Sequence, residues 1–112
     1  MTEGQPADRG ATTPVRVALP HQLRALARIE GEATVEVAGT VTLGATLDAL
    51  EATHPTLEGT VRERTTGRRR AMIRIFADGE DLSDEPPTTV LPTPVASGRQ
   101  PLRLVGAIAG GA

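Results

Sequence analysis

Leu43, Leu47 and Leu50 recur at the spacing of one face of an α-helix. Thr42 precedes them and is a residue type that commonly caps a helix N-terminus, whereas Pro55 stops a helix. Gly44 weakens the first turn by up to about 1 kcal/mol relative to alanine. We therefore predict one main helix between residues 42 and 55.

Short runs in which apolar and polar residues alternate, as in half-buried strands, flank this helix at residues 15–19, 34–37, 71–77 and 101–105. The first two runs indicate a hairpin, and we expect a helical turn in its connection around Leu23, Leu26 and Ile29. Asp78 and Gly79 are typical of a tight turn, which leads to a short return strand at residues 80–82.

The chain has 112 residues, enough for one domain. Residues 1–13 are polar and are predicted to form a disordered leader. Residues 14–106 form the predicted domain, in which proline-rich residues 83–100 are expected to be a long ordered loop. Residues 107–112 are expected to be a flexible tail, because ordering them costs at least ~6 kcal/mol. Burial of Ile108, the one large apolar side chain there, returns only ~1.5–3 kcal/mol.

Composition excludes several classes of function. Arginine supplies all twelve basic side chains, and the net charge of −2 disfavours a nucleic-acid binder. The sequence has no cysteine, which removes disulfides, thiolate nucleophiles and cysteine-ligated metals. Phe76 is the single aromatic residue. Neither a secretory signal nor a membrane-spanning run is visible, so we expect a cytoplasmic protein that binds no membrane.

No internal group of residues predicts catalysis. His21 and His54 are expected to be surface or capping residues, and Glu80, Asp81, Asp84 and Glu85 to lie in a solvated loop. The arginines at positions 68–70 are expected to form a solvated connector. The tail differs, since glycines without Cβ atoms can enter a narrow channel and present an unhindered carboxylate.

The order of these elements resembles the MoaD/ThiS family of ubiquitin-like sulfur carriers, which includes the small subunit of molybdopterin synthase and the cysteine-biosynthesis carrier CysO. The most similar segments are TLDALEATHP at residues 46–55, IFADGEDL at residues 75–82 and VGAIAGG at residues 105–111. The resemblance implies an α+β fold of the β-grasp type, with a mixed four- to five-stranded sheet packed on one main helix.

The resemblance also implies a carrier rather than an enzyme. Gly111 matches the family's reactive glycine and Gly110 the residue before it. The glycine carboxylate is expected to be adenylated by a partner related to ubiquitin-activating enzymes, and then converted to a thiocarboxylate that a downstream sulfur-accepting enzyme consumes. ATP and magnesium belong to the activating partner, and no cofactor is expected on this chain.

Ala112 follows Gly111, so a reactive carboxylate at Gly111 requires a C-terminal peptidase that removes Ala112. The predicted partner-binding residues are Met72, Phe76 and Ile108. Met72 and Phe76 are expected to point outward, because the β-branched Ile73 and Ile75 suit the packed face.

Three pathways remain open at this point, namely molybdopterin, cysteine and thiamin synthesis. The alternative function is a ubiquitin-like binding module or protein modifier without a role in sulfur transfer.

Overall fold

The computed structural model describes residues 11–106, which form a mixed five-stranded sheet in the order β2-β1-β5-β3-β4. The strands are β1 (Thr12–Ala18), β2 (Ala33–Ala38), β3 (Ile73–Ala77), β4 (Glu80–Asp81) and β5 (Leu102–Gly106). β1 and β5 are parallel, and the other three neighbouring pairs are antiparallel. This arrangement confirms the predicted α+β class.

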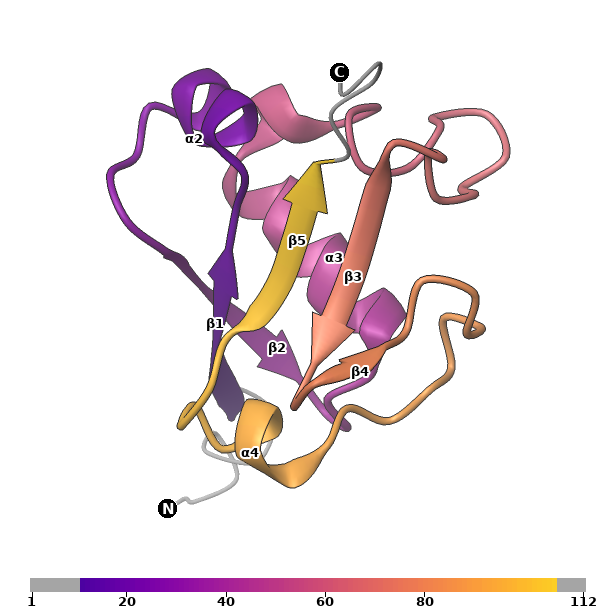
Figure 1. The fold of residues 1–112 in the computed structure, drawn as a ribbon. Helices are drawn as coiled ribbons and strands as arrows, with labels where there is room; N and C mark the ends of the chain where they lie inside the picture. Colours follow the sequence, from indigo (N-terminus) through magenta and orange to yellow (C-terminus); the bar gives the residue numbers. More distant parts are fainter. Residues whose placement is uncertain (1–10, 107–112) are drawn as a thin grey trace.

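One face of the sheet is covered by the main helix, α3 (Leu43–Thr53), which lies behind the strands in Figure 1. The remaining helical segments are α2 (His21–Ala27), the 3₁₀ turn Pro55–Leu57 and α4 (Thr93–Ala96). Among the described residues, no helix is long and apolar enough to cross a membrane.

The first strand begins earlier than predicted. Thr12 and Thr13, which were assigned to the disordered leader, pair with Ala38 and Val37 of β2. They extend β1 because the partner strand offers a continuous antiparallel ladder as far as its own last residue. The predicted hairpin is confirmed, and its connection contains the seven-residue helix α2.

The main helix begins as the sequence predicts. The Thr42 hydroxyl accepts a hydrogen bond from the Ala45 N–H at 3.1 Å, which caps the first turn. Leu43, Leu47 and Leu50 are all buried against the sheet. His54 follows the last helical residue, and its own N–H donates to the Leu50 carbonyl.

Gly44 has a role that helix propensity alone does not reveal. A Cβ at this position would lie 2.8 Å from the Pro87 Cβ and 3.0 Å from the Pro87 carbonyl oxygen. The Gly44 N–H donates to that same oxygen at 2.9 Å. The missing side chain therefore lets the segment that follows β4 pack directly on the first turn of α3.

The long segment at residues 83–100, predicted as an irregular loop, contains α4. Pro92 precedes this four-residue helix, and Val95 within it is fully buried. Leu91, four residues before Val95, is also buried. The two apolar side chains anchor the segment in the core, and its prolines stand at the N-cap and in the first turn of α4, where they are compatible with a helix.

The core is aliphatic, as the near absence of aromatic residues requires. Its inner layer comes from alternate residues of the strands, and the largest fully buried side chains are Leu50, Leu57, Ile75, Leu102, Val15, Val17, Val35, Val37, Val61 and Val95. The helices cover this layer, and the other face of the sheet remains open.

Candidate functional site

The described part of the chain ends at Gly106, in the middle of the sheet. β5 lies between β1 and β3, and Gly106 at its end pairs with Ile73 at the start of β3. Ile108, Gly110, Gly111 and Ala112 lie outside the described residues, as does all of the predicted tail. The structure thus places Gly106, the residue that directly precedes the predicted tail.

The open face beside this point carries apolar side chains. Ile73 and Ile75 are buried, whereas Met72 is 47% exposed and Phe76 is partly exposed, so this pair points outward. Val105, which is 40% exposed, joins them from β5. We call Met72, Phe76 and Val105 the open-face patch.

The registers of β3, β5 and β4 bring charged residues to the patch. Arg103 of β5 lies directly opposite Phe76, and Arg74 of β3 lies opposite Val105. Side chains that are directly opposite on one face of a sheet contact one another. Val105 is not among the predicted partner-binding residues, although its alternation with Leu102 and Leu104 in the sequence indicates that it points outward.

A polar network fixes the edge of this face at β4. The Asp81 carboxylate accepts hydrogen bonds from the Arg74 guanidinium and, at 2.9 Å, from the Ser83 N–H. The Ser83 side chain, together with the Arg74 guanidinium and the Ser83 N–H, lowers the pKa of Asp81 to about 2. The Ser83 hydroxyl also accepts from the Ile75 N–H at 2.8 Å, so one buried serine joins β3 to the segment after β4.

The acidic residues at positions 80–85 do not act as one group. Asp81 pairs with Arg74, and Asp84 pairs with Arg69. Within residues 11–106, no three carboxylate or histidine side chains are placed to hold a metal ion together. His21 is the first residue of α2 and His54 follows the end of α3, so the two belong to different elements.

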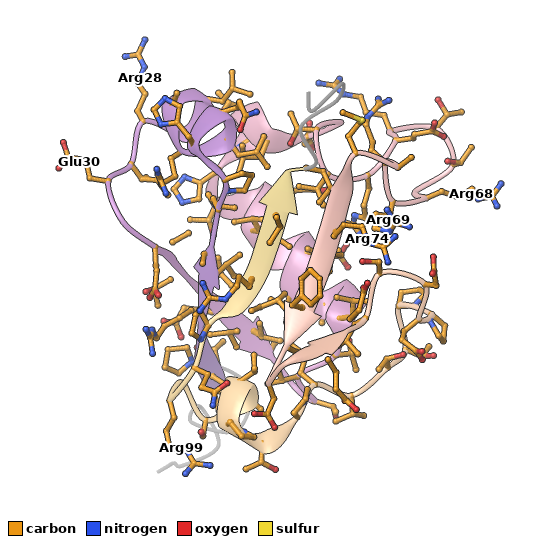
Figure 2. The ribbon with its side chains drawn as sticks, viewed as in Figure 1. Arg28, Glu30, Arg68, Arg69, Arg74 and Arg99 are labelled. Atoms are coloured by element: carbon orange, nitrogen blue, oxygen red, sulfur yellow. The ribbon has the colours of Figure 1, made fainter. Side chains whose placement is uncertain are left out.

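One of the three arginines at positions 68–70 differs from the predicted solvated connector. Arg68 projects away from the domain, whereas Arg69 turns inward beside Arg74 (Figure 2). The Arg69 side chain is only 18% exposed, and its guanidinium donates to the Ser83 and Ile73 carbonyls, each at 2.7 Å. Arg69 therefore ties the start of β3 to the segment after β4. Arg68 and Arg70 are exposed, as predicted, although Arg70 also donates to the Gly59 carbonyl.

Sequence comparison finds no family model and no curated protein that matches this chain. Its fold is similar to that of SAMP1 from Haloferax volcanii, with a TM-score of 0.68 and 26% identity over 88% of this chain and 99% of SAMP1. A second structure, of H. volcanii small archaeal modifier protein 1, gives the same TM-score and identity over 86% of this chain and 99% of that one.

A third similar structure is the Amycolatopsis orientalis BexX/CysO complex, with a TM-score of 0.64 and 21% identity over 87% of this chain and 99% of the matched chain. The structural neighbours are thus SAMP1 and CysO, small ubiquitin-like β-grasp proteins of the MoaD/ThiS sulfur-carrier and modifier type. The predicted resemblance and the ubiquitin-like β-grasp fold are confirmed.

Proposed function

We propose that this ubiquitin-like β-grasp chain is a sulfur carrier that acts through a thiocarboxylate at Gly111. The observation that carries the proposal is the likeness to SAMP1 and CysO over almost their whole length. The sequence adds the Gly110–Gly111 pair, in which Gly111 lies five residues after Gly106, the last residue of the central strand β5. A carrier of this kind supplies an acyl group and leaves catalysis to its partners.

The chemistry begins with a free carboxylate at Gly111. Hydrolysis of the Gly111–Ala112 peptide bond by a peptidase provides it. One carboxylate oxygen then attacks the α-phosphorus of ATP in the partner's active site, and pyrophosphate leaves. The resulting acyl adenylate is a good electrophile, because AMP is a far better leaving group than oxide.

Sulfur enters in the second step. A hydrosulfide nucleophile attacks the acyl carbon and displaces AMP, which takes the electron pair of the broken C–O bond. The product is a Gly111 thiocarboxylate that a downstream enzyme consumes. The glycines favour this passage because they present no Cβ atoms to the walls of the partner's channel. ATP and magnesium are bound by the activating partner.

The open-face patch is the surface that we assign to the activating partner. Its apolar side chains lie beside β5, so a protein that covers Val105 and Met72 is positioned to receive the segment after Gly106. Ile108 would extend this contact along the tail. Exposed apolar groups flanked by polar residues are typical of protein-binding surfaces.

Intact-mass spectrometry tests the proposal. The chain as printed, a form ending at Gly111, and a form ending at Gly111 with Gly111→Pro are each incubated with the cognate activating enzyme, ATP, magnesium and sulfide. We expect the form ending at Gly111 to gain the mass of one oxygen-to-sulfur exchange, and the other two forms to stay unchanged. The proposal is wrong if the form ending at Gly111 forms an adenylate but never exchanges oxygen for sulfur.

A protein modifier is the second candidate, and the name of small archaeal modifier protein 1 favours it. In this function the amine of another protein attacks the activated Gly111 carbonyl and forms an amide. The chain has no lysine of its own, so its side chains offer no competing amine. Peptide mapping of conjugates isolated from the native cell distinguishes an amide at Gly111 from a thiocarboxylate.

A further inference from the structure

A groove of about 590 Å³ lies beside the last part of β5. One wall is formed by residues 18–22 and Arg24, and the other by residues 103–106. Its volume falls within the range of sites that bind small ligands or short peptide segments. The groove adjoins the open-face patch through Val105 but continues to the opposite side of β5, toward β1 and α2.

The groove exists because β1 ends before β5 does. The parallel pairing of these strands consists of Val17 with Leu102 and Ala18 with Arg103. Pro20 then turns the chain into α2, whereas β5 continues for three more residues. Among residues 11–106, no strand lies opposite residues 104–106 on this side, although β3 pairs with them on the other.

An open edge of this kind can accept another strand. Backbone N–H and C=O groups that face an open sheet edge can form hydrogen bonds with an added extended segment. These groups alternate in direction along a strand, so those of Leu104 and Gly106 face the groove, whereas those of Val105 face β3. A Cβ at Gly106 would lie 3.5 Å from the Pro20 Cβ and 3.8 Å from the Gln22 Oε1, so a side chain at this position would lie against the other wall of the groove.

The charge of the groove favours an acidic occupant. Arg24 and Arg103 line it together with His21, and none of the lining residues is Asp or Glu. Arg24 donates to the Leu19 carbonyl at 3.2 Å. None of the ion pairs within the described residues involves Arg24 or Arg103. Carboxylates that enter the groove would face two arginines that hold no carboxylate in the described part of the chain.

We propose that this groove binds an extended, acidic segment of a partner protein, which adds to the open edge of β5 at residues 104–106. The segment takes the position that β1 vacates after Ala18, and its carboxylates pair with Arg24 and Arg103. Binding here would contact the domain at Gly106, the residue that precedes the predicted tail. The inference stands apart from the chemistry of Gly111 and holds for a sulfur carrier and for a modifier alike.

Titration of the ¹⁵N-labelled full chain with short peptides tests the inference. The probe is the capped heptapeptide Thr-Glu-Val-Glu-Val-Glu-Thr, and two controls replace its glutamates with arginines or methylate alternate backbone nitrogens. We expect saturable shifts of the amide signals of residues 104–106 and of Gln22 with the acidic probe. The arginine peptide and the methylated peptide are expected to bind at least about tenfold more weakly, a difference of about 1.4 kcal/mol.

Three variants locate the binding. Arg103→Glu reverses the sign of a groove charge, and Gly106→Val fills part of the groove without changing its charge. Arg68→Glu is the matched control, because Arg68 projects into solvent away from the groove (Figure 2). We expect at least about tenfold weaker binding for the first two variants and unchanged binding for the control. Each variant's amide spectrum verifies its fold.

The inference is overturned if the acidic probe produces no saturable shift at residues 104–106. It is equally overturned if the arginine peptide binds as well as the acidic one, or if Gly106→Val binds the probe like the unmodified chain.

Discussion

Gly44→Ala sets two effects against each other. Alanine favours a helix by about 1 kcal/mol over glycine, so propensity alone predicts a more stable protein. The structure predicts the opposite, because the new Cβ would lie 2.8 Å from the Pro87 Cβ and 3.0 Å from the Pro87 carbonyl oxygen. Both distances are shorter than ordinary van der Waals contact, and that oxygen accepts the Gly44 N–H bond.

The magnitude follows from what has to move. Overpacking of a closely packed site costs about 1–3 kcal/mol. Withdrawal of the Pro87 segment also stretches two hydrogen bonds of 2.9 Å, from the Gly44 N–H to the Pro87 carbonyl and from the Leu43 N–H to the Thr89 carbonyl. Each contributes about 0.5–1.5 kcal/mol. The two bonds are lengthened rather than lost, so only a small part of this contribution is forfeited. After the propensity gain of about 1 kcal/mol is subtracted, we expect the free energy of unfolding to fall by about 1–2 kcal/mol.

Thermal and urea unfolding of the full chain, followed by circular dichroism, measures this change. The expected loss lowers the thermal midpoint by about 4–16 °C. Ala52→Gly is the control, since Ala52 is exposed on the same helix and should lose at most about 1 kcal/mol through propensity alone. If Gly44→Ala is as stable as the unmodified chain or more so, the close approach of Pro87 does not determine the residue at position 44.

Three further predictions concern charges and the open face. The pKa of Asp81 is lowered to about 2 from 3.8, so its contribution to stability is complete above about pH 4 and is lost as the pH falls toward 2. Asp81→Asn should therefore lose less stability over that pH interval than the unmodified chain. Urea unfolding measures this, and an equal dependence of stability on pH in the two proteins would contradict the prediction. Arg69→Met should destabilise the fold by about 2–3 kcal/mol because it leaves inward-facing carbonyls without donors, whereas Arg68→Met should change it by less than about 0.5 kcal/mol in the same assay. In the form ending at Gly111, Val105→Glu should slow ATP-dependent activation by the cognate activating enzyme by about tenfold or more, measured as pyrophosphate release, while Thr34→Glu on the distant β2 should leave the rate unchanged. Similar rates for both variants would remove the open-face patch from the docking surface.

The features that local pattern determines were predictable. The leucine stripe, the Thr42 cap and the alternation around Ile73 and Ile75 each depend on neighbouring residues, and the structure confirms them. The same alternation placed Met72 on the outward face.

The features that depend on distant contacts were not predictable. Gly44 is explained by Pro87, and the inward turn of Arg69 is explained by carbonyls of Ile73 and Ser83 that only the folded chain brings together. α4 is anchored by the buried side chain of Val95, a tertiary contact that the proline-rich sequence around it does not reveal. The sequence therefore predicted the main helix, the strands and the outward direction of Met72 and Phe76. The groove beside β5 could be located only from the strand registers.

Because β5 lies in the centre of the sheet, the sheet can be completed only after residues 102–106 have been synthesised. β5 is the last described strand to be made, yet it joins the β1–β2 pair to the β3–β4 pair. Before residues 102–106 exist, the two pairs share no strand ladder, and closing the sheet requires contacts across most of the chain. A product that stops short of β5 lacks Val105, and with it part of the surface that the proposed function assigns to the activating partner.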